Sequence, residues 1–278
     1  MNGIGYKIKK TILYILLILL SVVCMFPFLL MIVNATRSGS EIMKSFTLIP
    51  SVYLKENWAT VFKYFNLFLG MWNSLKVAVP STLLCAYFSA MTAYALAMYK
   101  FKGNKVLFMT ILIFMMIPGQ LGLIGFYNLC TKLHLVNSYI PLIIPAIASP
   151  GTVFFLRQYV LSVMPPSLIE AARIDGSGEF HTFNSIVLPL MKPAIAVQAI
   201  FTFVSSWNNY FVPALILHND KKKTLPILIA QLRAADWLKF DMGQVYVMIA
   251  FSIFPVIIIY LILSRHIVQG VALGSVKG

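Results

Sequence analysis

The sequence predicts an all-α integral membrane protein with six transmembrane helices. Of the 278 residues, 60% are hydrophobic and only 11% are charged, whereas soluble domains have roughly 45–50% apolar and about 25% charged residues. A helix crosses a bilayer with about 20 mostly apolar residues, because lipid tolerates no unpaired backbone polar group. Six stretches of about that length contain no charged residue, and they cover residues 11–33, 77–98, 106–127, 136–156, 193–217 and 243–264.

The first stretch follows basic residues, as a secretory signal does, but it is too long for the apolar part of a signal and ends without a small-residue cleavage site. We therefore expect it to remain as a helix. In the second stretch, small residues recur at four-residue intervals, namely Ser89, Ala93 and Ala97, and also Ala86 and Ala90. This spacing predicts a helix face on which another backbone approaches closely.

The net charge of +14 comes from basic residues between the apolar stretches, and no basic stripe with interleaved aromatic residues occurs. This distribution is typical of a membrane protein and argues against a nucleic-acid partner. The basic residues of segments 7–10 and 100–105 lie on the same side in a six-helix arrangement, and the positive-inside rule puts that side in the cytoplasm. We expect both termini and residues 157–192 in the cytoplasm, with residues 37–76 and 218–241 outside.

The sequence lacks the residues of several kinds of chemistry. All eight acidic residues lie outside the six stretches, so the mid-membrane ionisable group of an ion-driven carrier is missing. The sequence has no phosphate-binding glycine loop, no zinc-protease helix and no nucleophile elbow. The four histidines are scattered, and the three cysteines share no metal-ligand spacing and are expected to be small buried side chains. We expect no catalytic residue, metal or cofactor in this chain, so a pump would need an ATPase partner.

The loop that precedes the fifth stretch carries helix signals. Ser167 and Glu170 have the spacing of a capping box, which predicts that a short helix begins at Ser167. Gly176 and Gly178 are expected to end that helix, and a second short helix runs up to Pro189. Ala171 and Ala172 would give the first helix a small-residue face that fits a cleft. The alternative is a loop that merely covers the bundle.

The same loop resembles the glutamate-alanine-alanine loop of bacterial ABC-importer permeases. The resemblance rests on Glu170, Ala171, Ala172, Gly176, Ile186, Leu188 and Pro189, all at the spacing of that family. Trp207 and Asn208, together with the ending at residues 270–278, resemble the MalG-type subunits of carbohydrate importers. The similarity covers nearly the whole chain. Many relatives have an acidic residue where this chain has Asn209.

The resemblance implies a type I importer permease fold in the bacterial cytoplasmic (inner) membrane. It implies four partners besides membrane lipid: a second, MalF-like permease, two ABC ATPase subunits that bind ATP and magnesium, and an extracytoplasmic sugar-binding protein. The implied regions are residues 1–70 with the first helix and an external segment, 71–265 as the core with a coupling loop at 157–193, and 266–278 as a cytoplasmic tail.

The resemblance also assigns roles to individual residues. Those expected to couple to the ATPase are Glu170, Ala171, Ala172, Asp175 and Gly176. The tail residues expected to contact the ATPase are Gly274, Ser275 and Lys277, unless the tail is disordered. The external residues expected to contact the binding protein are Arg233, Asp236 and Trp237, unless they form an ordinary solvated connector.

A path for sugars needs uncharged hydrogen-bonding groups and aromatic faces. The residues of this kind inside the stretches are Gln120, Asn128, Trp207, Asn208, Asn209 and Tyr210. These side chains have an alternative role in hydrogen bonds between helices. Three other functions stay open at this point: a permease for another solute such as glycerol phosphate or an amino acid, a secondary carrier or channel, and a membrane enzyme.

Overall fold

The computed structural model describes residues 4–234 and 241–275, and every regular element in these ranges is helical. The chain divides into two compact units. The first contains residues 1–67 and 228–254, and the second contains residues 68–227 and 255–278. The second unit carries most of the residues predicted to be functional. The absence of strands over the described ranges confirms the all-α prediction.

Four helical segments are long and apolar enough to cross a bilayer, and they are Tyr6–Ala35, Leu67–Met98, Ile140–Val163 and Met242–Ser264. Two further pairs of shorter helices meet the same criterion only when each pair is taken together, because a sharp bend separates their members. The pairs are Asn104–Met116 with Gly119–Lys132, and Glu179–Leu190 with Lys192–Trp207. Counting each bent pair once gives up to six spans, which is the predicted number, but the second pair begins at Glu179, before the predicted stretch 193–217.

The unbroken helices extend beyond the apolar stretches. The first is α1, Ile4–Ala35, the second is α4, Leu67–Met98, and the last is α15, Met242–Ser275. The prediction began the second helix at Val77 and ended the last at Ser264. The first limit is wrong, since the span begins at Leu67, whereas the second agrees with the span Met242–Ser264. The helix α15 itself continues to Ser275, because a helix continues for as long as its backbone hydrogen bonds continue, whereas apolar length marks only the part inside lipid.

The third predicted stretch is broken rather than straight. It consists of α5, Asn104–Met116, the 3-10 turn η1, Gly119–Gly122, and α6, Leu123–Lys132. The two halves are bent by 88°. The bend falls at Pro118 and Gly119, a sequence pair that favours turns.

The fifth predicted stretch is also broken, into α12, Lys192–Trp207, and α13, Phe211–Ile216. The break has a local cause, because Pro213 has no backbone N–H to donate to the carbonyl oxygen of Asn209 in a continuous helix. The fourth stretch contains α7, Ile140–Ile143, the 3-10 turn η2, Ile144–Ile147, and α8, Pro150–Val163. It therefore ends at Val163 and not at the predicted Leu156.

Polar contacts hold the first unit together. The helix α2, Gly39–Lys44, has a capping box between Ser38 and Glu41.

The side chain of Arg37 is buried and donates to the carbonyl oxygens of Glu41 at 2.6 Å and Ser45 at 2.8 Å. The backbone N–H of Gly39 donates to Asp241 Oδ2 at 2.9 Å, which joins α2 to the residue before α15. A third short helix, α3, covers Leu54–Tyr64.

The second unit has its main core where α4 crosses the loop between α8 and α12. Ala90 and Ala93 of α4 are completely buried, as is Ser89, so the predicted small-residue face exists and is in contact. The buried residues of this core are Ala90, Ala93, Tyr94, Leu156, Val160, Met164, Ile169, Phe183, Val187, Met191 and Ala194. The loop therefore packs directly on the transmembrane helices.

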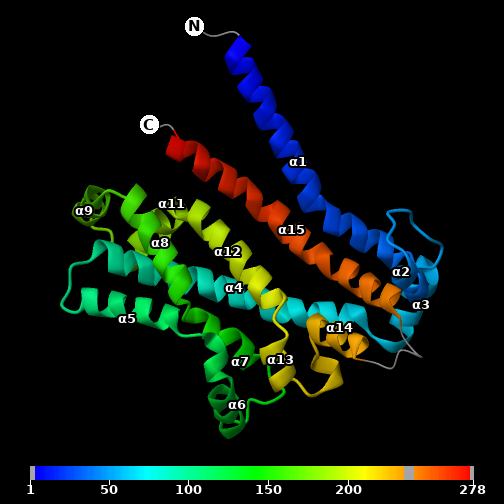
Figure 1. The fold of residues 1–278 in the computed structure, drawn as a ribbon. Helices are drawn as coiled ribbons and strands as arrows, with labels where there is room; N and C mark the ends of the chain where they lie inside the picture. Colours follow the sequence, from blue (N-terminus) through cyan, green and yellow to red (C-terminus); the bar gives the residue numbers. More distant parts are fainter. Residues whose placement is uncertain (1–3, 235–240, 276–278) are drawn as a thin grey trace. The chain divides into compact units, whose positions relative to one another are not determined.

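At the opposite end of α4, polar side chains fix the segment that precedes α14, Leu225–Arg233. Asn73 Nδ2 donates to the carbonyl oxygens of Lys221 at 2.9 Å and Lys223 at 3.0 Å. The hydroxyl of Ser74 accepts from the backbone N–H of Leu225 at 2.9 Å. Figure 1 shows α9, Pro166–Ile174, and α11, Leu188–Leu190, near one end of the helices of this unit and α6 and α13 near the other.

The three cysteines are free thiols. Cys85 and Cys130 are buried, as expected, and each is packed within the second unit. Cys24 is exposed on α1, so the prediction of a buried side chain is wrong for this residue. Its helix is apolar on every face, and apolar composition alone does not reveal which face is covered.

The closest backbone approach in the first unit involves Gly243, which predicts the effect of a substitution. A Cβ atom on Gly243 would lie 2.6 Å from Asn57 Nδ2 and closer still to the carbonyl oxygen of Arg37. We expect Gly243→Ala to destabilise the protein by about 1–3 kcal/mol through overpacking. The matched control is Gly125→Ala in α6, where no atom lies within 4 Å of the new methyl group. Thermal unfolding of the purified protein measures both variants, and equal midpoints would contradict the close approach.

Candidate functional site

The helix that carries the family-like residues is α9, Pro166–Ile174. The predicted capping box is wrong, because the residue before the helix is Pro165, which has no side-chain acceptor. Pro166 has its φ angle fixed near the helical value and starts the helix one residue earlier than predicted. Ser167 consequently lies inside the first turn, and Glu170 makes no capping bond.

The end of α9 agrees with the prediction. Gly176 adopts a φ of +79°, in the left-handed region that favours glycine. Its N–H donates to the carbonyl oxygen of Arg173 at 3.0 Å, and the N–H of Ser177 donates to that of Ala172 at 2.9 Å. These two bonds form a Schellman motif, which ends the helix and fixes the direction of the chain beyond it.

One face of α9 is buried and the other is exposed. Ile169 and Ala172, three residues apart and hence on one face, are buried, and Ile169 belongs to the core. Glu170, Ala171 and Asp175 point outward. The predicted face of two adjacent alanines is therefore divided, since only Ala171 is accessible from outside.

Sequence reasoning missed two exposed apolar side chains in this loop. Ile174, the last residue of α9, has 86% of its surface exposed, and Phe180 has 69% exposed. Both lie in a segment that was expected outside the apolar stretches. The signal that would have identified them is a large apolar residue beside charged residues in a polar loop.

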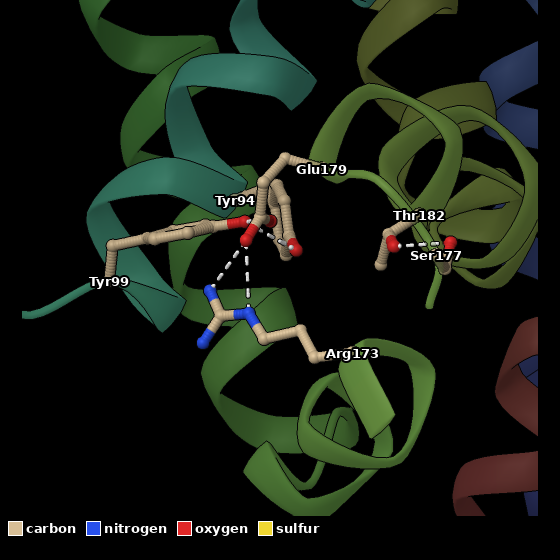
Figure 2. A network of polar contacts seen from close by, with 6 residues as sticks. All are labelled: Tyr94, Tyr99, Arg173, Ser177, Glu179 and Thr182. Carbon is tan, nitrogen blue, oxygen red and sulfur yellow. Dashed lines mark hydrogen bonds and ion pairs between the residues drawn. The ribbon is translucent and has the colours of Figure 1, made fainter. Parts of the chain in front are cut away.

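A network of polar side chains connects α9 to α4 (Figure 2). Arg173 donates through Nε and Nη2 to Glu179 Oε1, at 3.0 and 2.9 Å. The hydroxyl of Tyr99, in the loop after α4, donates to Glu179 Oε2 and lies 3.0 Å from the hydroxyl of Tyr94. The carboxylate of Glu179 thus contacts both Arg173 of α9 and Tyr99 in the loop after α4.

The network has a consistent electrostatic pattern. Desolvation and the hydrogen bond to Glu179 raise the pKa of Tyr99 well above its usual range, so the phenol stays protonated and able to donate. The hydrogen bond from Tyr99, together with Arg173, lowers the pKa of Glu179. The bonds to Glu179 and Tyr99 raise the pKa of Arg173. The network is therefore charged and intact at neutral pH.

The loop continues into α12 through α10, Glu179–Thr182, the π-helical turn η3, Phe183–Val187, and α11, Leu188–Leu190. Phe183 stacks on Tyr94 with ring centres 5.9 Å apart and meets the edge of Tyr87 at 5.6 Å. The Tyr87 hydroxyl donates to Asn184 Oδ1 at 3.2 Å. These contacts attach the segment to α4 along its length.

A cavity of about 420 Å³ lies in the second unit, where the two broken helices interrupt their backbones. This volume is within the roughly 300–1,000 Å³ of small-molecule sites. Its polar side chains are Ser206 and Asn209, and Phe126 adds an aromatic face. The remaining lining residues are Val77, Gly119, Gly122, Leu123, Pro141, Leu142, Pro145, Val212 and Pro213, so no charged residue is among them.

Of the six predicted substrate-path residues, only Asn209 lines this cavity. Gln120 is exposed within η1, and Asn128 is exposed on α6. Trp207 is buried and stacks on Phe203 with ring centres 5.7 Å apart, as a packing residue does. Asn208 and Tyr210 lie at the break but are exposed and do not line the cavity.

Sequence reasoning missed Ser206 and Phe126, the other two lining residues with polar or aromatic character. Ser206 precedes the predicted Trp-Asn pair by one helical position, and Phe126 follows the Pro-Gly break. The proline and glycine signals that break the two helices would have pointed to both.

The remaining predicted contacts lie partly beyond the described residues. Arg233 is the last residue of α14 and is exposed. Asp236 and Trp237 are outside the described residues, as is Lys277. Gly274 and Ser275 are the last two residues of α15, so the helix continues into the segment predicted to be a tail. No group of three side chains suited to hold a metal ion occurs in the residues that the structure describes.

Up to six apolar spans in the described residues, an exposed helical loop and an uncharged cavity are typical of multi-pass membrane transport subunits. The chain belongs to the family of binding-protein-dependent transport system inner membrane components, whose model matches residues 83–273. The matched region includes α9, the network around Glu179 and every residue around the cavity except Val77.

Comparison with known proteins agrees with this membership. The chain is 35% identical over 283 residues to the arabinooligosaccharides transport system permease protein AraQ of Bacillus subtilis (strain 168), covering 98% of this chain and 96% of the relative. It is 29% identical to the sn-glycerol-3-phosphate transport system permease protein UgpE of Brucella abortus (strain 2308), covering 92% and 94%. The structure of a bacterial ABC transporter involved in the import of the acidic polysaccharide alginate contains a chain with the same fold, at a TM-score of 0.77 and 21% identity, covering 95% of this chain and 98% of that one.

The left-handed conformation at Gly176 predicts the effect of a substitution at the end of α9. Alanine in this conformation costs about 1–2 kcal/mol, so we expect Gly176→Ala to loosen the Schellman turn and to lower ATP hydrolysis stimulated by the binding protein. The matched control is Gly178→Ala, since Gly178 has no positive φ and neither glycine has an atom within 4 Å of a new methyl group. Hydrolysis by the assembled importer measures both variants. Equal activities would show that the turn conformation is unimportant.

Proposed function

We propose that the chain forms half of the translocation path of an ATP-driven sugar importer and couples it to a separate ATPase through α9. The single observation that carries the proposal is the division of α9 into a face packed on the transmembrane core and a face open to a partner. Such an element touches both the path and whatever binds the open face.

The open face has the chemistry of a docking site. Ile174 offers an exposed apolar side chain, Ala171 allows close approach, and Glu170 offers a charge beside them. Interfaces of this kind have an apolar centre and a polar rim. The sequence contains no phosphate-binding loop of its own, so ATP and magnesium belong to the partner. We propose two ABC ATPase subunits, one for this chain and one for a MalF-like second permease.

Closure of the ATPase pair would move α9, and the helices packed on it would follow. Ile169 belongs to a close-packed core that includes Ala90 and Val160. Close-packed interiors change between discrete arrangements rather than deform continuously. The same chain would thereby alternate between an inward and an outward opening.

The lining of the cavity favours a neutral, hydroxylated solute as the transported molecule. Ser206 and Asn209 supply uncharged hydrogen-bonding groups, and Phe126 supplies an aromatic face. The oligosaccharide named for the AraQ relative has this chemistry. The UgpE relative favours glycerol phosphate as a second candidate, but a phosphate calls for a cationic partner, and the lining contains none.

The other contacts are part of the same proposal. The external segment with Arg233, Asp236 and Trp237 would contact an extracytoplasmic sugar-binding protein, and Gly274, Ser275 and Lys277 would contact the ATPase subunits. Both termini would then lie in the cytoplasm, on the side of α9. The basic residues of segments 7–10 and 100–105 support this orientation.

The cavity assignment predicts that Asn209→Ala weakens uptake. The lost side chain removes a hydrogen bond to the solute worth about 0.5–1.5 kcal/mol, which corresponds to a roughly two- to thirteenfold loss. The control is Asn128→Ala, an exposed amide on α6 away from the cavity. Uptake of a labelled neutral oligosaccharide, with glycerol phosphate in parallel, is the measurement. Equal losses in both variants would contradict the cavity assignment, and uptake of glycerol phosphate alone would contradict the sugar.

The docking assignment predicts that Glu170→Ala lowers binding-protein-stimulated ATP hydrolysis without lowering expression. Because Glu170 makes no capping bond, its removal leaves the helix start unchanged. A hydrogen bond to a charged group contributes about 1.5–3 kcal/mol, so we expect at least a roughly tenfold loss of stimulation. The matched control is Glu56→Ala, an exposed glutamate on α3. Full stimulation in the Glu170 variant would rule out its role in coupling.

A further inference from the structure

The turn between α9 and α10 is held rigid by side chains from both helices. The Schellman bonds fix its backbone, and the hydroxyls of Ser177 and Thr182 lie 2.8 Å apart across it. Thr182 is buried. Arg173 and Glu179 close the outer side of the turn with their ion pair. We name this unit, residues 173–182, the elbow.

The elbow is connected to α12 through the chain itself. Its second helix continues through η3 and α11 to α12, with only the turn residue Met191 and a bend of 79° before α12. Any displacement of α9 therefore reaches α12 through covalent bonds. It reaches α4 only through side chains, because α4 is distant in the sequence.

The outermost of these side-chain connections is Tyr99. Its hydroxyl donates to Glu179 Oε2, and its ring lies under the Arg173 guanidinium, 5.1 Å from ring centre to Cζ. Tyr94 of α4 packs edge-on against the same ring, with centres 5.3 Å apart. Figure 2 shows the Tyr99 ring and Arg173 converging on the one carboxylate of Glu179.

Tyr99 is itself held in place by an ordered loop. Asn104, at the start of α5, donates through Nδ2 to the carbonyl oxygens of Tyr99 at 2.9 Å and Leu96 at 3.2 Å. Arg157 of α8 donates to the same Leu96 oxygen at 3.3 Å, and its guanidinium lies 3.9 Å from the centre of the Phe108 ring. A force on the Tyr99 hydroxyl is therefore passed to the junction of α4 and α5.

The energy of the network argues against a role in stability. Arg173 and Glu179 have 47% and 55% of their side chains exposed. Exposed ion pairs contribute about 0–1 kcal/mol to folding, because water screens them. The larger part of the stability comes from the buried core beneath, which includes Phe183 and Val187. The network can be removed without loss of the fold.

We propose that Tyr99 is a positioning residue that links the elbow to α4 through Glu179, so that movement of α9 displaces α4 together with α12. The inference deepens the proposed coupling function and rests on it. Without the Tyr99 hydroxyl, the ATPase would still move α12 through the chain, but α4 would follow incompletely. Hydrolysis would continue while fewer solute molecules cross for each ATP.

The test uses the complete importer in proteoliposomes, with its binding protein and an oligosaccharide. Tyr99→Phe removes the hydroxyl and keeps the ring that contacts Arg173 and Tyr94. We expect hydrolysis within about twofold of the unchanged protein and a roughly threefold or greater fall in solute transported per ATP, since one hydrogen bond to a charged group is lost. The thermal midpoint should shift by less than about 4 °C.

Two further variants distinguish positioning from packing. Tyr159→Phe removes a hydroxyl beside the same core. That hydroxyl has no hydrogen-bond partner in residues 4–234 or 241–275, so we expect an unchanged number of solute molecules transported per ATP.

Glu179→Ala removes the carboxylate that Tyr99 and Arg173 share. Adding Tyr99→Phe to it should cause no further fall in solute transported per ATP, because both substitutions act through one bond. Additive losses, or a loss that parallels a fall in thermal midpoint, would overturn the proposal.

Comparison of the Tyr99→Phe and Glu170→Ala variants distinguishes the role of Tyr99 from the coupling function of α9. If Tyr99→Phe keeps the normal ratio while Glu170→Ala abolishes stimulation, the link through Tyr99 is wrong and the docking of α9 stands. If neither variant affects hydrolysis or transport, the coupling function of α9 fails as well. A normal ratio in Tyr99→Phe overturns the inference in either case.

Discussion

The approach of the loop segments to α4 depends on the absence of large side chains along one face of that helix. Ser89, Ala90 and Ala93 are fully buried, and any longer side chain there would separate α4 from Leu156, Phe183 and Val187. In lipid, where the hydrophobic effect gives little drive for helices to associate, such close packing is the main attraction between them. The buried half of α9 exists because this contact exists.

Polar groups fix α4 at both ends within the second unit, so a displacement of one end of the helix is transmitted to the other. Asn73 and Ser74 bond the segment before α14 at one end, and Tyr94 and Tyr99 meet the elbow near the other. With 32 residues and a rise of 1.5 Å per residue, the helix is about 48 Å long. The helix is therefore longer than the hydrocarbon layer of a bilayer, which is about 30 Å thick, and its two ends lie on opposite sides of that layer.

The sequence predicted what depends on local composition. Apolar length identified the four unbroken spans, and the glycine signal located the end of α9 at Gly176. The start of α9 was wrong because the fixed ring of Pro166 outweighed the spacing of Ser167 and Glu170. The breaks were missed because hydropathy does not register that Pro213 lacks an N–H. The bond from Tyr99 to Glu179 joins residues 80 positions apart, and no local pattern specifies such a pair.

The unequal exposure of the three thiols determines how this protein behaves toward sulfur chemistry. Cys85 lies among the hydroxyls of Ser89, Thr152 and Thr202, and Cys130 is enclosed beside Ile216 and Leu217. Neither can meet a reagent or an oxidant without partial unfolding of the second unit. Cys24 alone is accessible, on a helix that is itself apolar. Replacement of that one residue would leave a chain in which every added cysteine acts as a unique reporter.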